Sequence, residues 1–204
     1  MCPRQSNAER AESTRRLLTR TARRQFTMRG YSATTLAEIA KSSGLTTGAL
    51  YYHWAGKDDL LADVIHNVYG DLARRLKTAT DPHSTPTDQL LVAGREFLDL
   101  CSDPRVARLL LIDAPAALGY EKWREIDDRW WLTPTVHLVQ QAHAGQMSHG
   151  ASRHMALALL GSLTYLGREV ATTQQPGAAD DAARTYGALL RALMETADDH
   201  ANSD

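Results

Sequence analysis

Cysteine and long apolar runs are both scarce in this chain of 204 residues. Its two cysteines, Cys2 and Cys101, lie far apart and outside any C-x-x-C spacing, which argues against a disulfide framework or a zinc–thiolate site. No stretch stays apolar for 18 residues, and the polar, arginine-bearing N-terminus lacks the hydrophobic run of a signal peptide. We therefore expect a cytoplasmic protein without a membrane segment.

The sequence also lacks residue sets that would carry catalysis or bind a metal. No nucleophile–base pair, paired carboxylates or phosphate-cradling glycine loop stands out. His137, His143, His149 and His154 follow one another at intervals of six, six and five residues, which misses the i, i+3 or i+4 spacing of ligands on one helix. We expect no enzymatic activity, no metal and no cofactor.

The net charge of −1 conceals a strong asymmetry between the two parts of the chain. Residues 1–78 carry 13 Lys and Arg against 7 Asp and Glu, a balance of +6, whereas residues 79–204 carry 10 against 17, a balance of −7. A phosphate-binding module joined to a separate partner-binding module shows such a division. On charge alone, a chance imbalance between solvated surfaces remains the alternative.

Residues 34–57 predict a helix-turn-helix. Thr35 and Glu38 form a capping box, so a helix should begin directly after Thr35. Gly44 can take the positive φ of the sharp turn that ends this helix. Thr46 can then cap a second helix, whose inward side consists of the apolar residues Ala49, Leu50 and Trp54.

The other side of this second helix carries residues that suit DNA better than a core. In a helix-turn-helix the second helix enters the major groove, and its N-terminal residues reach base edges. Thr47 and Gly48 lie at that leading end, and Tyr51, one turn further on, can reach a base methyl or a phosphate. Tyr52 and His53 are better placed to donate to phosphates, which fix register and not sequence.

Lys57 contradicts a local rule, because a cation near a helix N-terminus opposes the helix dipole. We interpret it as a residue that meets an anion docked at that helix start, where free N–H groups also point. The full set of predicted DNA-binding residues is Thr35, Thr46, Thr47, Gly48, Tyr51, Tyr52, His53 and Lys57.

A pattern of fixed spacing extends beyond this motif and consists of Phe26, Gly30, Tyr31, Thr34, Thr35, Ile39, Ala40, Gly44, Leu45, Gly48, Leu50, Tyr51, His53, Trp54, Lys57, Leu60 and Leu61. The pattern resembles the N-terminal domain of TetR-type (TetR/AcrR) transcriptional regulators over roughly residues 12–65. Trp54 stands where such proteins more often carry Phe, and Thr46-Thr47 replaces a commoner Ser-Lys-like pair. Past residue 75 the resemblance is only architectural.

The pattern of apolar residues in the rest of the chain predicts helices, with neither strand-like alternation nor an internal repeat. Helices are expected at about 8–29, 58–78, 87–101, 103–112, 120–144, 151–173 and 178–198 in addition to the two short ones, with Pro134 kinking or splitting the helix that contains it. We therefore predict an all-α protein. Its expected parts are a helix-turn-helix DNA-binding domain at 8–56 (motif at 35–54), a connecting helix at 57–78, and an effector-binding and dimerisation domain at 79–204.

The last two expected helices mix small residues with large apolar ones, which lets helices pack closely. An ordinary intramolecular core is one interpretation. A helix-turn-helix monomer, however, reads only a few base pairs, whereas a twofold dimer reads two half-sites about 34 Å apart. We therefore predict a homodimer on a palindromic DNA site, with dimerisation residues Leu159, Leu163, Leu166, Tyr186, Leu189, Leu190 and Leu193.

Three of the four tryptophans lie within a short span, which suggests a cavity between helices for an apolar or aromatic small molecule. A heavily packed core is the plainer interpretation for any one of these residues. The family resemblance implies an effector pocket in this part of the chain but no motif that locates it. The candidate ligand-binding residues are Asp113, Tyr120, Trp123, Arg124, Trp130, Trp131, Met147 and Tyr165.

Together these features predict a one-component DNA-binding transcriptional regulator. We expect a repressor that a small-molecule effector releases from a palindromic operator by reorienting the connecting helix. The alternatives are an activator, a ligand-independent DNA-binding regulator, or a helical ligand-binding protein without specific DNA binding.

Overall fold

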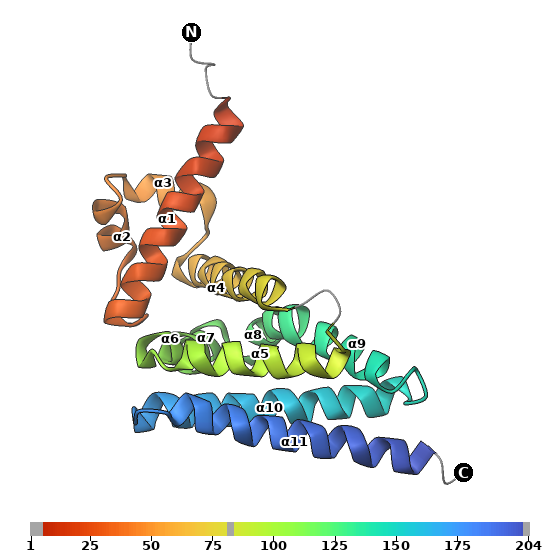
Figure 1. Cartoon of the computed structure of the whole chain (residues 1–204). Helices are drawn as coiled ribbons and strands as arrows, with labels where there is room; N and C mark the ends of the chain where they lie inside the picture. Colours follow the sequence, from red (N-terminus) through yellow and green to blue (C-terminus); the bar gives the residue numbers. More distant parts are fainter. Residues whose placement is uncertain (1–5, 81–83, 202–204) are drawn as a thin grey trace. The chain divides into compact units, whose positions relative to one another are not determined.

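The computed structural model describes residues 6–80 and 84–201, and every regular element in these ranges is helical (Figure 1), which confirms the all-α prediction. No helix in these ranges is long and apolar enough to cross a membrane. Cys2 lies outside the described residues, and Cys101 is a buried free thiol. The elements are α1 (Asn7–Arg29), α2 (Leu36–Ser42), α3 (Thr47–His53), α4 (Lys57–Ala79), α5 (Pro86–Cys101), α6 (Pro104–Arg108), the π-helix η1 (Leu109–Asp113), α7 (Ala114–Leu118), α8 (Tyr120–Asp127), the π-helix η2 (Asp128–Leu132), α9 (Thr133–Ala142), α10 (His149–Thr173) and α11 (Ala178–Ala201).

The chain forms two compact units, whose boundary differs from the predicted one. The first unit, here called the head, comprises the chain up to Val68 together with Arg108–Trp123. The second, the body, comprises Tyr69–Ala107 and the chain from Arg124 onward. The predicted division placed all of 79–204 in one domain, whereas η1, α7 and the start of α8 belong to the head.

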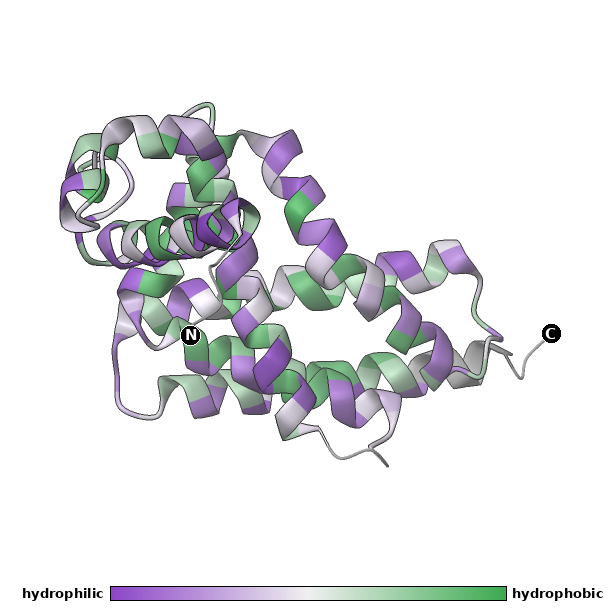
Figure 2. Cartoon of the chain, turned by 90° about the horizontal axis from the view of Figure 1, so that it is seen from above, coloured by the Kyte–Doolittle hydropathy of each residue, from purple (hydrophilic) through white to green (hydrophobic). Residues whose placement is uncertain are grey.

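The head is built on a small apolar core. Its helices are amphipathic, so each turns an apolar side inward, as the striped colouring in Figure 2 shows. Burying these side chains is the main source of stability for such a unit, at roughly 1.5–3 kcal/mol for each large one. The fully buried large residues of the head are Leu18, Phe26, Ile39, Leu50, Leu60, Leu61, Ile65, Leu109 and Leu110.

In the body, α10 and α11 lie side by side and both pack on α5 (Figure 1). Gly94 permits the close approach of α5 and α11, because a Cβ atom there would lie 2.2 Å from Cε1 of Tyr186. Tyr186 itself is buried, and so is Leu190 one turn further on. This part of the core therefore depends on a residue without a side chain.

Each of the two π-helices ends two residues before a proline. Pro134 cannot donate to the carbonyl of Trp130, and the chain answers with a π turn in which the N–H of Thr133 bonds to the carbonyl of Asp128. Pro115 stands in the same relation to η1, where the N–H of Ala114 bonds to Leu109. The expected break at Pro134 is thus a change of helix type inside a continuous helical segment.

Most of the predicted dimerisation residues lie in the core of the body. Leu159, Leu163, Tyr186 and Leu190 are buried within the body, because their faces of α10 and α11 pack against other helices of the same chain. Leu166 and Leu193 are half-buried, and only Leu189 of the predicted set is exposed. The exposed apolar residues of these helices are instead Leu157, Tyr165 and Leu189.

Candidate nucleic-acid interface

The helix-turn-helix forms where the capping residues predicted it. The Thr35 hydroxyl accepts from the N–H of Glu38 (3.2 Å), while the Thr35 N–H donates to the Glu38 carboxylate (2.8 Å). Gly44 has a φ of +67°, which allows the turn, and the Thr46 hydroxyl accepts from the N–H of Ala49 (3.3 Å) to begin α3. These local bonds fix where α2 ends and α3 begins.

The outer side of α3 is open, and its inner side is anchored. Leu50 and Trp54 are buried in the head core, whereas Tyr51 and Tyr52 are 59% and 78% exposed. Gly48 at the start of the helix is exposed as well. Tyr51 and Tyr52 place large aromatic side chains at the surface of a short, well-anchored helix, with Tyr52 beside the ring of His53, and this surface is suited to an external partner.

The other residues predicted to contact DNA around α3 are less exposed or are already hydrogen-bonded. Thr46 is exposed, but its hydroxyl is engaged in the cap; Thr47 and His53 are half-buried. Thr35 is exposed at the start of α2, where its hydroxyl also donates to the Glu38 carboxylate (2.8 Å). The hydroxyls of Thr35 and Thr46 are therefore already bonded within the chain.

The structure gives Lys57 partners within the chain. Its ammonium group donates to the carbonyls of Tyr31 and Thr34, each at 2.9 Å, and lies 4.0 Å from the centre of the Tyr31 ring. The side chain is half-buried. Lys57 therefore stabilises the loop that leads into α2, and the unfavourable position near a helix start is explained by these carbonyls without an external anion.

A second network, centred on Asp63 of α4, was not predicted from the sequence. One carboxylate oxygen of Asp63 accepts from the Trp54 indole N–H (2.7 Å) and from both Nε and Nη2 of Arg15 (3.0 and 2.5 Å). The Arg15 guanidinium also lies 5.9 Å from the Trp54 ring centre. A buried tryptophan needs a hydrogen-bond partner for its N–H. The presence of Trp54 in place of Phe was therefore a feature of the sequence that could have indicated this network.

Helix α1 holds α2 through a second set of contacts. Arg29 forms an ion pair with Glu38 (2.8 Å), and Gln25 donates to the Ser42 hydroxyl (2.7 Å). The bond from Arg29, supported by those from Thr35, lowers the pKa of the Glu38 carboxyl to about 2. Both ends of α2 are therefore tied to the same helix.

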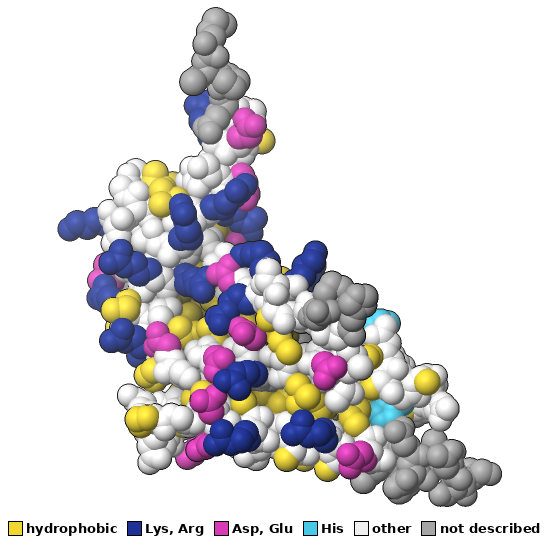
Figure 3. Space-filling view, in the orientation of Figure 1, with side chains coloured by type: hydrophobic (Ala, Val, Ile, Leu, Met, Phe, Trp, Pro, Cys, Tyr) yellow, Lys and Arg dark blue, Asp and Glu magenta, His cyan; other side chains and the backbone are white. Residues whose placement is uncertain are grey.

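Arginines are frequent on α1, and Figure 3 shows their side chains gathered over this helix. Arg15 is committed to Asp63, and Arg23 donates to Asn67 at 3.0 Å. The exposed arginines of this helix that make no bond outside it in the described structure are Arg10, Arg16, Arg20 and Arg24. A positive surface of this kind attracts the phosphates of a nucleic acid.

The predicted ligand-binding residues are divided between the two units. Asp113, Tyr120 and Trp123 belong to the head, whereas the other members of the set belong to the body. Tyr165 is 75% exposed and Tyr120 64%, so neither lines an interior. Their aromatic character suggested a pocket, but the register of their helices directs both rings outward.

One part of the predicted aromatic set does lie at a buried polar contact. The ring of Trp131 meets that of Tyr69 edge-on at 5.2 Å, and the Tyr69 hydroxyl donates to Asp127 (3.2 Å). Burial raises the pKa of the Asp127 carboxyl to about 6, against the opposing effect of the Tyr69 bond, and burial also raises the pKa of Tyr69. Sequence periodicity gave no sign of this pair.

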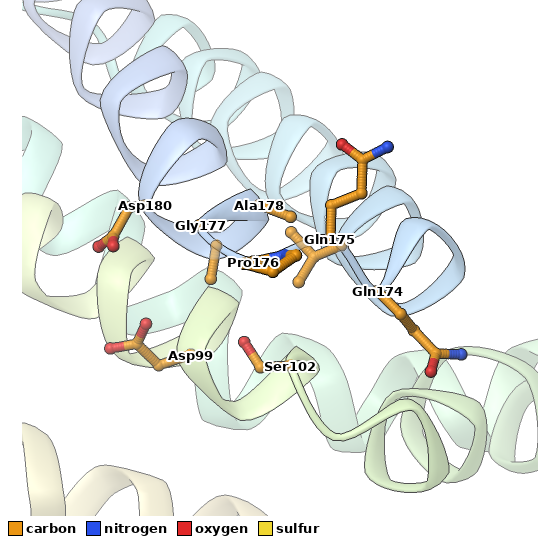
Figure 4. A pocket seen from close by; sticks show the side chains of 10 residues that line it. Asp99, Ser102, Gln174, Gln175, Pro176, Gly177, Ala178 and Asp180 are labelled. Carbon is orange, nitrogen blue, oxygen red and sulfur yellow. The ribbon is translucent and has the colours of Figure 1, made fainter.

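A cavity of about 420 Å³ opens elsewhere in the body, where the loop between α10 and α11 meets the end of α5 (Figure 4). Asp99, Ser102, Gln174 and Asp180 give it a polar lining, and none of the predicted ligand-binding residues lines it. It therefore does not correspond to the predicted apolar pocket.

Within the described ranges, no three His, Cys, Asp or Glu side chains come together as a metal site. His143 is buried, and its Nδ1 lies 2.8 Å from the Val139 carbonyl. Gln140 contacts the ring of His149, and Gln141 that of His137. Three of the four candidate histidines, His137, His143 and His149, thus have partners within the chain.

The fold and the α3 surface define a helix-turn-helix DNA-binding protein, and sequence comparison identifies its family. Residues 18–64 match the family described as "Bacterial regulatory proteins, tetR family", and residues 87–195 match "Tetracyclin repressor-like, C-terminal domain". The chain belongs to the TetR family of transcriptional regulators.

Similar curated proteins agree over part of their length. The HTH-type transcriptional regulator TtgR of Pseudomonas putida is 36% identical over 106 residues, 50% of this chain and 49% of the relative. The HTH-type transcriptional repressor KstR2 of Mycobacterium tuberculosis is 30% identical over 86 residues, 42% of this chain and 40% of that protein. The chain spans about half the length, or less, of these two curated relatives.

Solved structures extend the likeness to the whole fold. A TetR-family regulator from Pectobacterium atrosepticum has a TM-score of 0.67 at 25% identity, covering 93% of this chain and 95% of that one. FadR from Bacillus subtilis, solved in complex with stearoyl-CoA, has a TM-score of 0.69 at 18% identity, covering 86% and 96%. The second match, at this identity, shows the fold alone.

Proposed function

We propose that this TetR-family regulator is a homodimeric repressor that binds a palindromic operator and is released from it by a small-molecule effector. The observation that carries the DNA-binding part is the exposed Tyr51–Tyr52 surface on α3, which is anchored by the buried Leu50 and Trp54. A short helix held in this way can enter a major groove without losing its own packing.

Two further observations support the proposal. The exposed arginines of α1 supply positive charge on the same unit, which accounts for sequence-independent attraction to phosphates. The exposed Leu157, Tyr165 and Leu189 on α10 and α11 supply an apolar surface suited to a second copy of the chain. A relative named as a repressor, KstR2, supports the direction of control.

Selection of random duplex DNA on the purified full-length protein tests the proposal. We expect a palindromic consensus with half-sites about one helical turn, roughly 34 Å, apart. Tyr51→Ala should then weaken binding to the consensus by about 1–3 kcal/mol and relax specificity at the base it contacts. Binding that depends on salt but yields no consensus would contradict sequence-specific recognition by α3.

The effector part is tested on the same consensus with a panel of apolar, aromatic and acyl-chain compounds. A repressor of the proposed kind loses operator affinity when one of them binds, since the ligand must prefer the conformation that does not fit DNA. A regulator whose operator affinity is unchanged, or raised, by every compound that binds it would contradict release and favour an activator.

A further inference from the structure

The head contains a segment that lies about eighty residues beyond the end of α1 in sequence. Arg108 is the residue directly before η1, and Asp113 is the last residue of η1. Both belong to the same compact unit as α1 and the loop that enters α2. Arg108 makes polar contacts with the end of α1 and Asp113 with that loop, whereas Leu109, Leu110 and Leu111 between them are buried apolar residues.

Arg108 closes the C-terminal end of α1. Its Nη2 atom donates to the carbonyls of Thr27 (3.1 Å) and Phe26 (3.4 Å), which lie in the last turn of that helix. Carbonyls in a last helical turn lack helix partners, and a cation there also complements the helix dipole. Gly30 has a φ of +89°, and a Cβ atom there would lie 3.3 Å from the same Nη2 atom.

Asp113 holds the next peptide group. Its carboxylate accepts from the backbone N–H of Tyr31 (3.1 Å), and the same oxygen lies 3.5 Å from Nε of Arg108. On the other side of Tyr31, its carbonyl accepts from Lys57 (2.9 Å). The Tyr31 residue is therefore bonded at both its N–H and its carbonyl by side chains distant in sequence.

Further hydrogen bonds of this loop connect Tyr31 directly to the start of α2. The Thr34 hydroxyl donates to the Gly30 carbonyl (2.8 Å), and Thr34 is fully buried. The following residue, Thr35, is the N-cap of α2. Gly30, Tyr31 and Thr34 thus form a short bonded path from the end of α1 to the start of the helix-turn-helix.

The π-helix explains how two residues five positions apart can act on one loop. In an α-helix, residues five apart differ by about 140° around the axis, so their side chains diverge. The wider turn of η1, with its i to i+5 hydrogen bond from Ala114 to Leu109, brings Arg108 and Asp113 onto the same side. Pro115, which cannot donate to the Leu111 carbonyl, favours this turn.

From this geometry we propose that Arg108 and Asp113 form a latch, a pair of positioning residues that fixes the end of α1 and the Gly30–Thr34 loop and thereby sets the orientation of α2 and α3 for DNA. The pair touches no base or phosphate in this role. The proposal rests on DNA binding by the head as proposed above, and it adds residues outside the helix-turn-helix that this binding requires.

The test measures operator affinity and the salt dependence of binding for Arg108→Ala and Asp113→Ala in the full-length protein. We expect each to weaken operator binding by about tenfold, with the double variant losing less than the product of the two, because the residues act as one unit. The slope of log K against log salt should remain that of the unchanged protein, since no phosphate contact is lost. Unchanged affinity, or a flattened slope for Arg108→Ala, would overturn the latch.

Two variants separate positioning from a general loss of folding. Asp113→Asn keeps an acceptor for the Tyr31 N–H and should retain most of the affinity that Asp113→Ala loses. Arg95→Ala removes an ion pair with Asp180 (2.5 Å) that joins α5 to α11 in the body, and should leave operator affinity unchanged. If Asp113→Asn binds as weakly as Asp113→Ala although both are folded, the hydrogen bond to Tyr31 is not what positions α2.

Hydrogen exchange of the Tyr31 amide provides a readout that needs no DNA. It should be protected in the unchanged protein and in Asp113→Asn, and should exchange at least about tenfold faster in Asp113→Ala. If the protein binds no specific DNA but this pattern holds, the proposed function fails and the hold on Tyr31 stands. If the Tyr31 amide exchanges its hydrogen at the same rate in all three proteins, the proposed latch is wrong, whatever the protein binds.

Discussion

At the scale of single residues, Trp54 departs from the family pattern, and neighbouring side chains in the structure form hydrogen bonds that accommodate it. Trp54 fills the place of a more usual Phe, and its additional N–H is satisfied by Asp63, which also receives Arg15. Asp63 of α4 therefore joins the start of α1 to the residue that ends α3. The recognition helix is held at its C-terminal end by this network and at its N-terminal end by the Thr46 cap.

Trp54→Phe should destabilise the head by at least about 1–2 kcal/mol, because a hydrogen bond to a charged group is lost and the smaller ring leaves part of the buried space of the indole unfilled. Urea unfolding followed by circular dichroism measures the change. Tyr52→Phe provides the control: it removes a hydroxyl from an exposed aromatic residue and should alter stability by less than about 0.5 kcal/mol. Equal stability of Trp54→Phe and the unchanged protein would show that the bond to Asp63 contributes nothing.

Asp127 offers a prediction about pH. Its pKa rises from 3.8 to about 6 on folding, chiefly through burial, so the folded protein binds the proton more tightly than the unfolded chain does. This group therefore favours folding below pH 4, and its contribution is lost as the pH rises from about 4 to 6. Above pH 6 the ionised carboxylate costs on the order of 1–3 kcal/mol.

Asp127→Asn should consequently raise the melting temperature at pH 8 and have little effect near pH 4, since the amide still offers an oxygen to the Tyr69 hydroxyl. Calorimetry across this pH range measures the difference. Glu125→Gln, an exposed carboxyl on the same helix, should show no such dependence. A stabilisation by Asp127→Asn that is equal at pH 4 and pH 8 would exclude ionisation as its cause.

At the scale of elements, local signals predicted helices better than they predicted packing. The Thr35–Glu38 box, the Thr46 cap and the prolines gave helix starts close to those observed, because each acts through bonds within a few residues. The assignment of η1 and α7 to the head could not be predicted, because residues 108–123 contact α1 through tertiary bonds that leave no periodicity in the sequence. The carbonyl partners of Lys57 could not be predicted for the same reason, because they are 26 and 23 positions away.

Gly94 shows how much one packing contact between elements matters. Gly94→Ala should destabilise the body by about 1–3 kcal/mol, since the new methyl would overlap the buried Tyr186 ring and the better helix propensity of Ala recovers at most about 1 kcal/mol. Gly70→Ala in α4 is the matched control, because its nearest neighbour would be at an ordinary 3.5 Å. Thermal unfolding of both variants decides the matter: Gly94→Ala should melt lower than the unchanged protein, and Gly70→Ala should melt at the same temperature or higher.

At the scale of the whole molecule, burial divides the large apolar residues of α10 and α11 into two groups. Large apolar residues on α10 and α11 were expected to face a partner, but a four-residue periodicity does not tell an intramolecular core from an interface. Burial distinguishes a core from an interface. Leu159, Leu163 and Leu190 are enclosed within the chain, whereas Leu157, Tyr165 and Leu189 are 40%, 75% and 38% exposed. A dimer interface on these helices would use the exposed residues Leu157, Tyr165 and Leu189.

This assignment gives the last prediction. Leu157→Glu and Leu189→Glu place charge on the exposed face without entering the core, and in a twofold dimer each change occurs twice at one interface. Sedimentation should show a monomer that keeps its helical circular dichroism, and operator affinity should fall because a single head contacts only one half-site. Gln146→Glu, an exposed position in the loop before α10, adds the same charge and should remain dimeric. Dimers that persist in both leucine variants would place the interface on another surface of the chain.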